Sequence, residues 1–146
     1  MKPITLYDPT PLIRLALDFK HVDVDLHISK KPREILADIK GPALTHNNHV
    51  LIGEPSVLGW IDRRFPAPTI FPHDLEVYTK AATLAHAIMT DQAAANELWK
   101  AFKNGTSPFL TGPVPNIADL ALITHLDQLP ASNAARDWPR TVMHHG

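Results

Sequence analysis

Few residues of this chain have side chains suited to catalysis or metal binding. The sequence has no cysteine, which excludes a cysteine nucleophile, a thiolate metal site and a disulfide framework. Tyr7 and Thr10 carry hydroxyl groups near the end of the first apolar segment and are the candidates for catalysis. The alternative is a structural role for both, with Tyr7 packed as an aromatic residue at the end of a strand and Thr10 capping a helix. His46 and His49 flank a two-residue turn closely enough to face each other. Zinc sites use three or four protein ligands, so this pair predicts solvated turn residues and no metal site.

Composition narrows the remaining function classes. The 146 residues are 45% hydrophobic and 20% charged, with a net charge of -1, which is typical of one or two small globular domains. The near-neutral charge gives no general attraction to nucleic acid or to anionic membranes. There is no apolar window of about 20 residues and no signal peptide, so we expect a cytoplasmic protein that contacts neither nucleic acid directly nor membrane.

The first half of the chain alternates between strand and helix patterns. A strand is predicted at 4–7, followed by a helix that begins at Pro11. Alternating apolar residues from 22 to 28 predict a second strand with one buried face, and 32–40 predicts a short helix. The segments 43–45 and 50–52 flank an Asn-Asn turn and predict a hairpin.

The second half of the chain predicts helices only. A helix from Pro55 to about Arg64 is followed by a proline-rich segment. Two amphipathic helices are expected next, with the inward-facing residues Leu75, Tyr78, Ala82, Ala85 and Met89 in one and Ala94, Leu98 and Phe102 in the other. Asn116 and Asp119 have the spacing of a capping box at the start of a helix over 117–129, which is apolar nearly all round and therefore buried. A last short helix is predicted within 133–145.

This order of elements resembles the glutathione transferase superfamily, which joins a thioredoxin-like βαβαββα domain to an all-helical domain. The most specific stretch runs without a gap over 41–66 and includes Gly-Pro-Ala-Leu, Val-Leu and Trp-Ile-Asp-Arg-Arg-Phe-Pro; a second match covers 108–120. The resemblance implies a thioredoxin-like domain at 1–66, a linker at 67–73 and a shortened helical domain at 74–146. Within the superfamily, 62–72 is most similar to the stringent starvation protein A family, whose bacterial members associate with RNA polymerase.

The resemblance also places a remnant of a glutathione site at Pro42, Ala43, Gly53 and Glu54, with Pro42 as the cis proline of thioredoxin-like domains. Glu54 falls where the family has a serine that receives the γ-glutamyl carboxylate, and Pro55 has no backbone N–H to offer. No serine or cysteine lies between Tyr7 and Pro11. We therefore expect no catalytic residues and no cofactor. The alternative is a glutathione-dependent transferase with Tyr7, assisted by Thr10, as thiol activator.

The non-catalytic interpretation requires a protein partner, and RNA polymerase or one of its associated factors is the partner that the resemblance implies. The expected interaction surface combines arginines with apolar and proline residues, which suit an interface rim and core: Arg63, Arg64, Phe65, Pro66, Ala67, Pro68 and Phe71. An ordinary linker whose Phe65 and Phe71 are buried remains the alternative at this segment. A homodimer, or a domain that only blocks a partner, also fits the sequence.

Overall fold

The computed structural model describes residues 4–22, 26–29, 41–47, 49–127 and 133–144. Two compact units make up the chain, Met1–Pro66 and Ala67–Gly146. None of the described helices is long and apolar enough to cross a membrane.

The first unit is built on a four-stranded mixed sheet. Its strands follow the order β2-β1-β3-β4 and have the bounds Ile4–Tyr7 (β1), Leu26–Ser29 (β2), Ala43–His46 (β3) and His49–Ile52 (β4). β1 pairs parallel with β2 and antiparallel with β3, while β3 and β4 form the predicted hairpin. This topology places β1 in the interior of the sheet, with its carboxyl end beside the start of β3.

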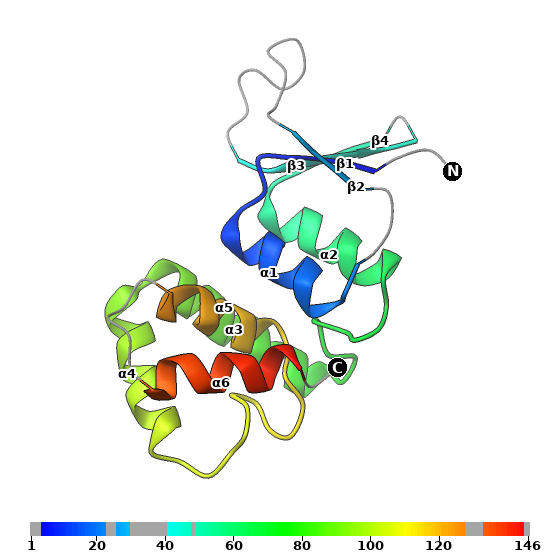
Figure 1. Ribbon diagram of the computed structural model, residues 1–146. Helices are drawn as coiled ribbons and strands as arrows, with labels where there is room; N and C mark the ends of the chain where they lie inside the picture. The colour runs from blue at the N-terminus through cyan, green and yellow to red at the C-terminus, as the bar shows by residue number, and fades with distance from the viewer. Residues whose placement is uncertain (1–3, 23–25, 30–40, 48, 128–132, 145–146) are drawn as a thin grey trace. The chain divides into compact units, whose positions relative to one another are not determined.

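Helices α1 (Pro11–Phe19) and α2 (Glu54–Arg64) lie on one face of this sheet (Figure 1). Thr10 caps α1, because its hydroxyl oxygen accepts a hydrogen bond from the backbone N–H of Ile13 at 3.3 Å. The two helices turn their apolar faces toward the sheet and bury, among others, Ile13, Phe19, Val57 and Ile61 against Leu6 and Leu44.

The structure differs from the predictions for β2. Of the predicted strand 22–28, residues 23–25 lie outside the described residues, Val22 is not in a strand, and 26–28 are strand as predicted; Ile28, which was expected on the buried face, is 47% exposed. An edge strand has a neighbour on one side only, and this leaves Ile28 less covered than the residues of β1. The helix predicted at 32–40 lies outside the described residues.

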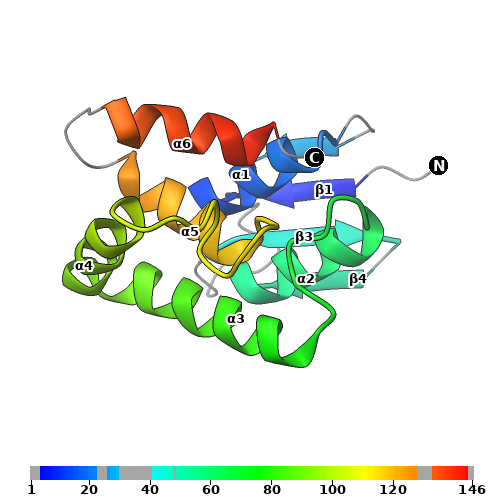
Figure 2. The same ribbon diagram turned by 90° about the horizontal axis from the view of Figure 1, so that it is seen from below.

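The second unit is all helical: α3 (Leu75–Thr90), α4 (Gln92–Lys103), α5 (Ile117–Leu126) and α6 (Asn133–Met143). α5 contacts α3, α4 and α6 and lies between α3 and α6 in Figure 2. All 10 residues of α5 are buried, as the sequence predicted. The helix ends earlier than predicted, at Leu126, and 128–132 lies outside the described residues.

The predicted inward face of α3 is wrong in part. The structure buries Ala81, Ala85 and Ile88, whereas Leu75, Tyr78 and Met89 are 77%, 41% and 42% exposed. The small alanines let α3 approach α5 closely, and this rotates the larger apolar residues away from the contact. α4 is shifted in the same way and buries Ala95 and Trp99 in place of the predicted stripe at 94, 98 and 102.

The segment predicted as a linker, 67–73, belongs to the second unit. Ile70 is fully buried, and its backbone carbonyl accepts a hydrogen bond from the N–H of Ile117 at 2.8 Å. This hydrogen bond joins the segment to the first residue of α5.

Candidate functional site

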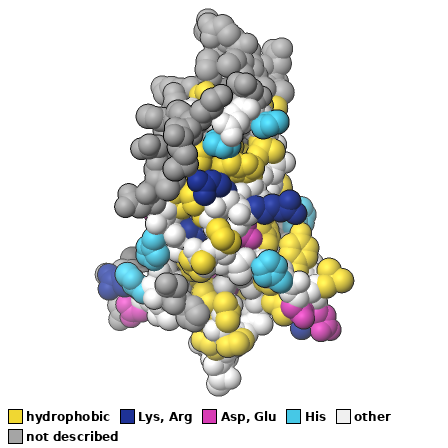
Figure 3. All heavy atoms as spheres, turned by 90° about the vertical axis from the view of Figure 1, so that its right-hand side faces the viewer, with side chains coloured by type: hydrophobic (Ala, Val, Ile, Leu, Met, Phe, Trp, Pro, Cys, Tyr) yellow, Lys and Arg dark blue, Asp and Glu magenta, His cyan; other side chains and the backbone are white. Residues whose placement is uncertain are grey.

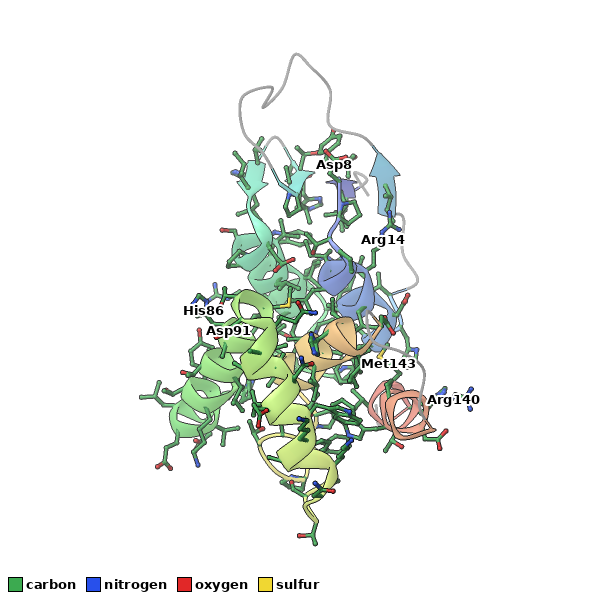
Figure 4. The ribbon with its side chains drawn as sticks, turned by 90° about the vertical axis from the view of Figure 1, so that its left-hand side faces the viewer. Asp8, Arg14, His86, Asp91, Arg140 and Met143 are labelled. Atoms are coloured by element: carbon green, nitrogen blue, oxygen red, sulfur yellow. The ribbon has the colours of Figure 1, made fainter. Side chains whose placement is uncertain are left out.

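The residues predicted for a glutathione-site remnant gather at the carboxyl end of β1. Tyr7, the last residue of β1, is half-buried and pairs in register with Ala43 of β3. The backbone N–H of Gly53 donates a hydrogen bond to the carbonyl of Pro42 at 2.9 Å. Asp8 follows β1 (Figure 4) with a φ of 47° and is exposed. The structure therefore brings Tyr7, Pro42, Ala43 and Gly53 to one end of the sheet.

The prediction of a cis bond at Pro42 is wrong. Among the described residues the one cis peptide bond is Ala67–Pro68, and the Gly41–Pro42 bond is trans. Gly41, immediately before Pro42, has a φ of 102°, a value that glycine adopts without strain.

The amino-terminal end of α2 is poorly equipped to receive an anion. Glu54 is the first residue of the helix and is half-buried, and Pro55 has no N–H. Gly53 at the N-cap position provides no side-chain hydrogen bond. The carboxylate of Glu54 lies at the positive end of the helix dipole, where it is stabilised itself and repels a second carboxylate.

The two arginines of the predicted interaction surface, Arg63 and Arg64, are exposed at the end of α2. The guanidinium carbon of Arg64 lies 4.9 Å from the centre of the Phe65 ring, a cation–π contact. The sequence prediction combined such basic side chains with apolar neighbours. On the face that Figure 3 shows, basic and hydrophobic side chains lie beside one another.

The remaining residues of this surface differ in exposure. Pro66 and Ala67 are exposed, whereas Phe65, Pro68 and Phe71 are half-buried. Phe71 contacts Tyr78 at a ring-centroid distance of 6.2 Å. Residues 63–66 belong to the first unit and 67–71 to the second, so each group is positioned by its own unit.

Lys20 is a buried cation that sequence analysis missed. Its side chain is 0% exposed, and its ammonium nitrogen Nζ lies 2.8 Å from Oδ1 of Asp62. The same ammonium donates a hydrogen bond to the backbone carbonyl of Phe65. Lys20 thus joins the end of α1 to the end of α2, close to Arg63 and Arg64 in the sequence. A lysine at a helix end is typical of solvent-exposed surfaces, and the sequence carried no signal of this pairing.

The histidines of the hairpin show no metal centre. His46 and His49 pair in register across β3 and β4, and the His46 ring contacts Trp60 edge-on at 5.6 Å. Within the described part of the chain, no cluster of three or more histidine, aspartate or glutamate side chains could hold a metal ion.

The second unit contains the predicted capping box at the start of α5. Oδ2 of Asp119 accepts the backbone N–H of Asn116 at 2.9 Å, and Oδ1 of Asn116 accepts the N–H of Ala118 at 3.0 Å. Oδ1 of Asp119 also accepts the N–H of Leu110 at 2.9 Å, a long-range bond that the sequence did not predict. Burial raises the pKa of Asp119 to about 6, although these backbone donors act in the opposite direction.

Comparisons with known proteins identify the architecture. No family model and no curated protein sequence match the chain. Among solved structures, a glutathione S-transferase from Rhodospirillum rubrum F11 superposes with a TM-score of 0.72 at 14% identity, over 97% of this chain and 88% of that one. The chain has the glutathione transferase fold.

Two further solved structures share this fold. FzlA from C. crescentus matches with a TM-score of 0.70 and 18% identity, over 97% of this chain and 88% of its own. A glutathione transferase homologue from Burkholderia gl BGR1, solved with bound glutathione, matches with a TM-score of 0.65 and 20% identity, over 98% and 92% of the two chains. These likenesses establish the fold, and the activity has to be argued from the residues of this glutathione-transferase-fold chain.

Proposed function

We propose that this protein is a non-catalytic member of the glutathione transferase fold that works by binding another protein. The observation that carries the proposal is the start of α2, where Glu54 and Pro55 occupy the positions expected to receive the glutathione carboxylate. Two like charges about 4 Å apart repel by about 1 kcal/mol in water and by several-fold more when partly buried. The half-buried Glu54 therefore opposes glutathione binding.

The segment after β1 supports the same conclusion. The hydroxyl oxygen of Thr10 already accepts a hydrogen bond from the N–H of Ile13, so it serves as a helix cap. No serine or cysteine follows Tyr7 before α1 begins at Pro11. We accordingly propose no cofactor and no catalytic residue for this protein.

The proposed partner is RNA polymerase or one of its associated factors, met in the cytoplasm. The support is the resemblance of 62–72 to the stringent starvation protein A family, together with exposed arginines beside proline and phenylalanine. The proposal includes a homodimer, because α3 exposes Leu75, Tyr78 and Met89.

The second candidate is a glutathione-dependent transferase that uses Tyr7. Two observations favour it: Tyr7 is half-buried at the end of β1 beside Ala43, and a structural neighbour contains bound glutathione. In this candidate the phenol would hold the glutathione thiolate, with Thr10 as a second hydroxyl.

Calorimetric titration with glutathione at neutral pH separates the two candidates. We expect a dissociation constant above about 1 mM, which corresponds to less than about 4 kcal/mol of binding free energy. Saturation well below this concentration, lost in Tyr7→Phe, would contradict the non-catalytic proposal.

The Glu54→Ser variant tests the reason for the weak binding. If the charge at α2 is responsible, Glu54→Ser binds glutathione more tightly than wild type. Glu76→Ser is the matched control, because Glu76 lies in the first turn of α3, and its effect should be nil. If Glu54→Ser brings no gain, the single-charge explanation fails and the short segment after β1 is the remaining cause.

A further inference from the structure

A cavity of about 390 Å³ opens on the second unit, among residues that no prediction assigned to a site. Three segments line it: the end of α4, the loop that follows, and α6. Its lining residues include three rings, Trp99, Phe102 and Trp138, and two opposite charges, Lys103 and Asp137. The volume falls within the range of small-molecule sites, which are mostly apolar with a few placed polar groups.

The three aromatic rings form one wall. Their centroids lie 4.9 Å apart for Phe102 and Trp138, 5.8 Å for Trp99 and Trp138, and 6.1 Å for Trp99 and Phe102. At these distances the rings pack against each other and leave no space for a further ring between them. A flat molecule can only stack on the side of the cluster that faces the cavity.

A hydrogen bond to the loop after α4 and burial of one ring hold the aromatic wall in place. The indole N–H of Trp138 donates a hydrogen bond to the backbone carbonyl of Pro108 at 2.9 Å, which joins α6 to the loop after α4. Trp99 is 7% exposed and is anchored in the core of the unit. The aromatic surface is therefore formed before any ligand arrives, which lowers the entropic cost of binding.

The two charges at the cavity are both exposed, and neither forms an ion pair with a residue that the structure describes. Neither Lys103 nor Asp137 lies within 4.0 Å of an oppositely charged group in the part of the chain that the structure describes. They therefore do not neutralise each other, although both line the same cavity. Arg140, one turn further along α6, points away (Figure 4) and does not line it.

We propose that this cavity binds a free aromatic α-amino acid. The ring would stack on the aromatic wall, the carboxylate would meet the ammonium of Lys103, and the ammonium would meet the carboxylate of Asp137. A molecule with only one charge would leave one of the two protein charges unmatched. The inference uses residues of the second unit alone and is independent of the proposed protein partner and of glutathione.

L-Phenylalanine is the probe that tests the site. Two of the three tryptophans of the chain, Trp99 and Trp138, line the cavity, so tryptophan fluorescence reports binding, and calorimetry repeats the measurement. We expect saturation with a dissociation constant below about 1 mM. The absence of saturation up to this concentration would overturn the proposal.

Two variants and two truncated ligands separate the charge contacts. Lys103→Met and Asp137→Asn should each weaken L-phenylalanine binding about tenfold, the loss of one charge-assisted hydrogen bond. Lys103→Met should leave the affinity for 2-phenylethylamine, which has no carboxylate, unchanged. Asp137→Asn should likewise leave the affinity for 3-phenylpropionate unchanged, because this ligand has no ammonium group.

Lys100→Met is the matched control, because Lys100 lies in the same last turn of α4 and does not line the cavity. An unchanged affinity for L-phenylalanine in either Lys103→Met or Asp137→Asn, or an equal loss in Lys100→Met, would overturn the assignment. Melting curves of each variant confirm that it is folded.

Discussion

Asp119 shows how one buried carboxylate can organise a helical unit. Its side chain joins the start of α5 to the loop at Leu110, because it accepts hydrogen bonds from the backbone N–H groups of both Asn116 and Leu110. Asp119→Ala leaves both N–H groups without this acceptor. We expect a loss of about 2 kcal/mol in the free energy of unfolding at pH 7, at the upper end for a helix cap. Urea unfolding measures it.

The control for this variant is Asp91→Ala. Asp91 caps the exposed start of α4 through the N–H groups of Ala93 and Ala94, so solvent can replace it and the loss should be about 1 kcal/mol or less. An Asp119→Ala protein as stable as wild type would show that α5 does not depend on the capping box.

The same substitution has a pH dependence whose sign follows from burial. The pKa of Asp119 is about 6 in the folded protein against 3.8 ordinarily, so the folded state holds the proton more tightly. The part of the stabilisation that comes from this tighter proton binding is therefore full below about pH 4 and is lost as pH rises through 6, while the hydrogen bonds that Asp119 accepts account for the cost that remains at pH 7. The cost of Asp119→Ala should be larger at pH 4.5 than at pH 7, by roughly 1–3 kcal/mol. A smaller cost at pH 4.5 would contradict this pKa direction.

At the scale of elements, Lys20 is the polar link between α1 and α2. Lys20→Met leaves Asp62, which is 12% exposed, without its ammonium partner. Removing one partner of a buried ion pair costs about 3–5 kcal/mol, and the partial exposure of Asp62 places this case at about 2–4 kcal/mol. Denaturant unfolding is the measurement.

A second variant separates the charge from the packing. In Lys20→Met with Asp62→Leu both members of the ion pair are removed together, and much of the stability should return. Lys100→Met, which breaks the exposed pair with Glu97, should change stability little. If the double variant is no more stable than Lys20→Met, the loss comes from packing and not from the unpaired charge.

Local signals in the sequence were sufficient to predict the elements that depend on neighbouring residues. Thr10 before Pro11 and the Asn116 to Asp119 spacing place helix starts, because a cap bonds to residues two or three positions away. The inward face of α3 could not be read in this way. Its apolar residues offer two overlapping stripes, and the close contact of Ala81 and Ala85 with α5 decides between them.

The candidate sites also differ in whether the sequence could predict them. The gathering of Tyr7, Pro42, Ala43 and Gly53 was implied by the family resemblance, which carries an order of strands, and not by periodicity in this sequence. The pairing of Lys20 with Asp62 spans 42 positions, and the cavity at Lys103 joins α4 to α6. Such long-range contacts leave no periodic trace in one sequence.

For the whole molecule, the decisive test is binding to RNA polymerase. The variant Arg63→Ala, Arg64→Ala, Pro68→Ala removes two exposed charges and one proline from the proposed surface. We expect it to lose capture by purified RNA polymerase in a pull-down, and we expect the double variant Arg63→Ala, Arg64→Ala, which keeps Pro68, to lose capture while its melting temperature stays near that of wild type. Lys80→Ala with Lys103→Ala is a charge-matched control outside the surface and should retain binding. Capture of the triple variant at wild-type level would remove this surface from the proposal.

The central position of α5 also affects how the chain is made. Ala81, Ala85 and Ile88 of α3 are covered by a helix that begins at Ile117, and the ribosome releases the chain from its amino-terminal end. During synthesis, the apolar faces of α3 and α4 therefore stay exposed to solvent until α5 has left the exit tunnel. A nascent chain halted before residue 117 would expose these faces to chaperones, whereas the first unit ends at Pro66 and can already have folded by then.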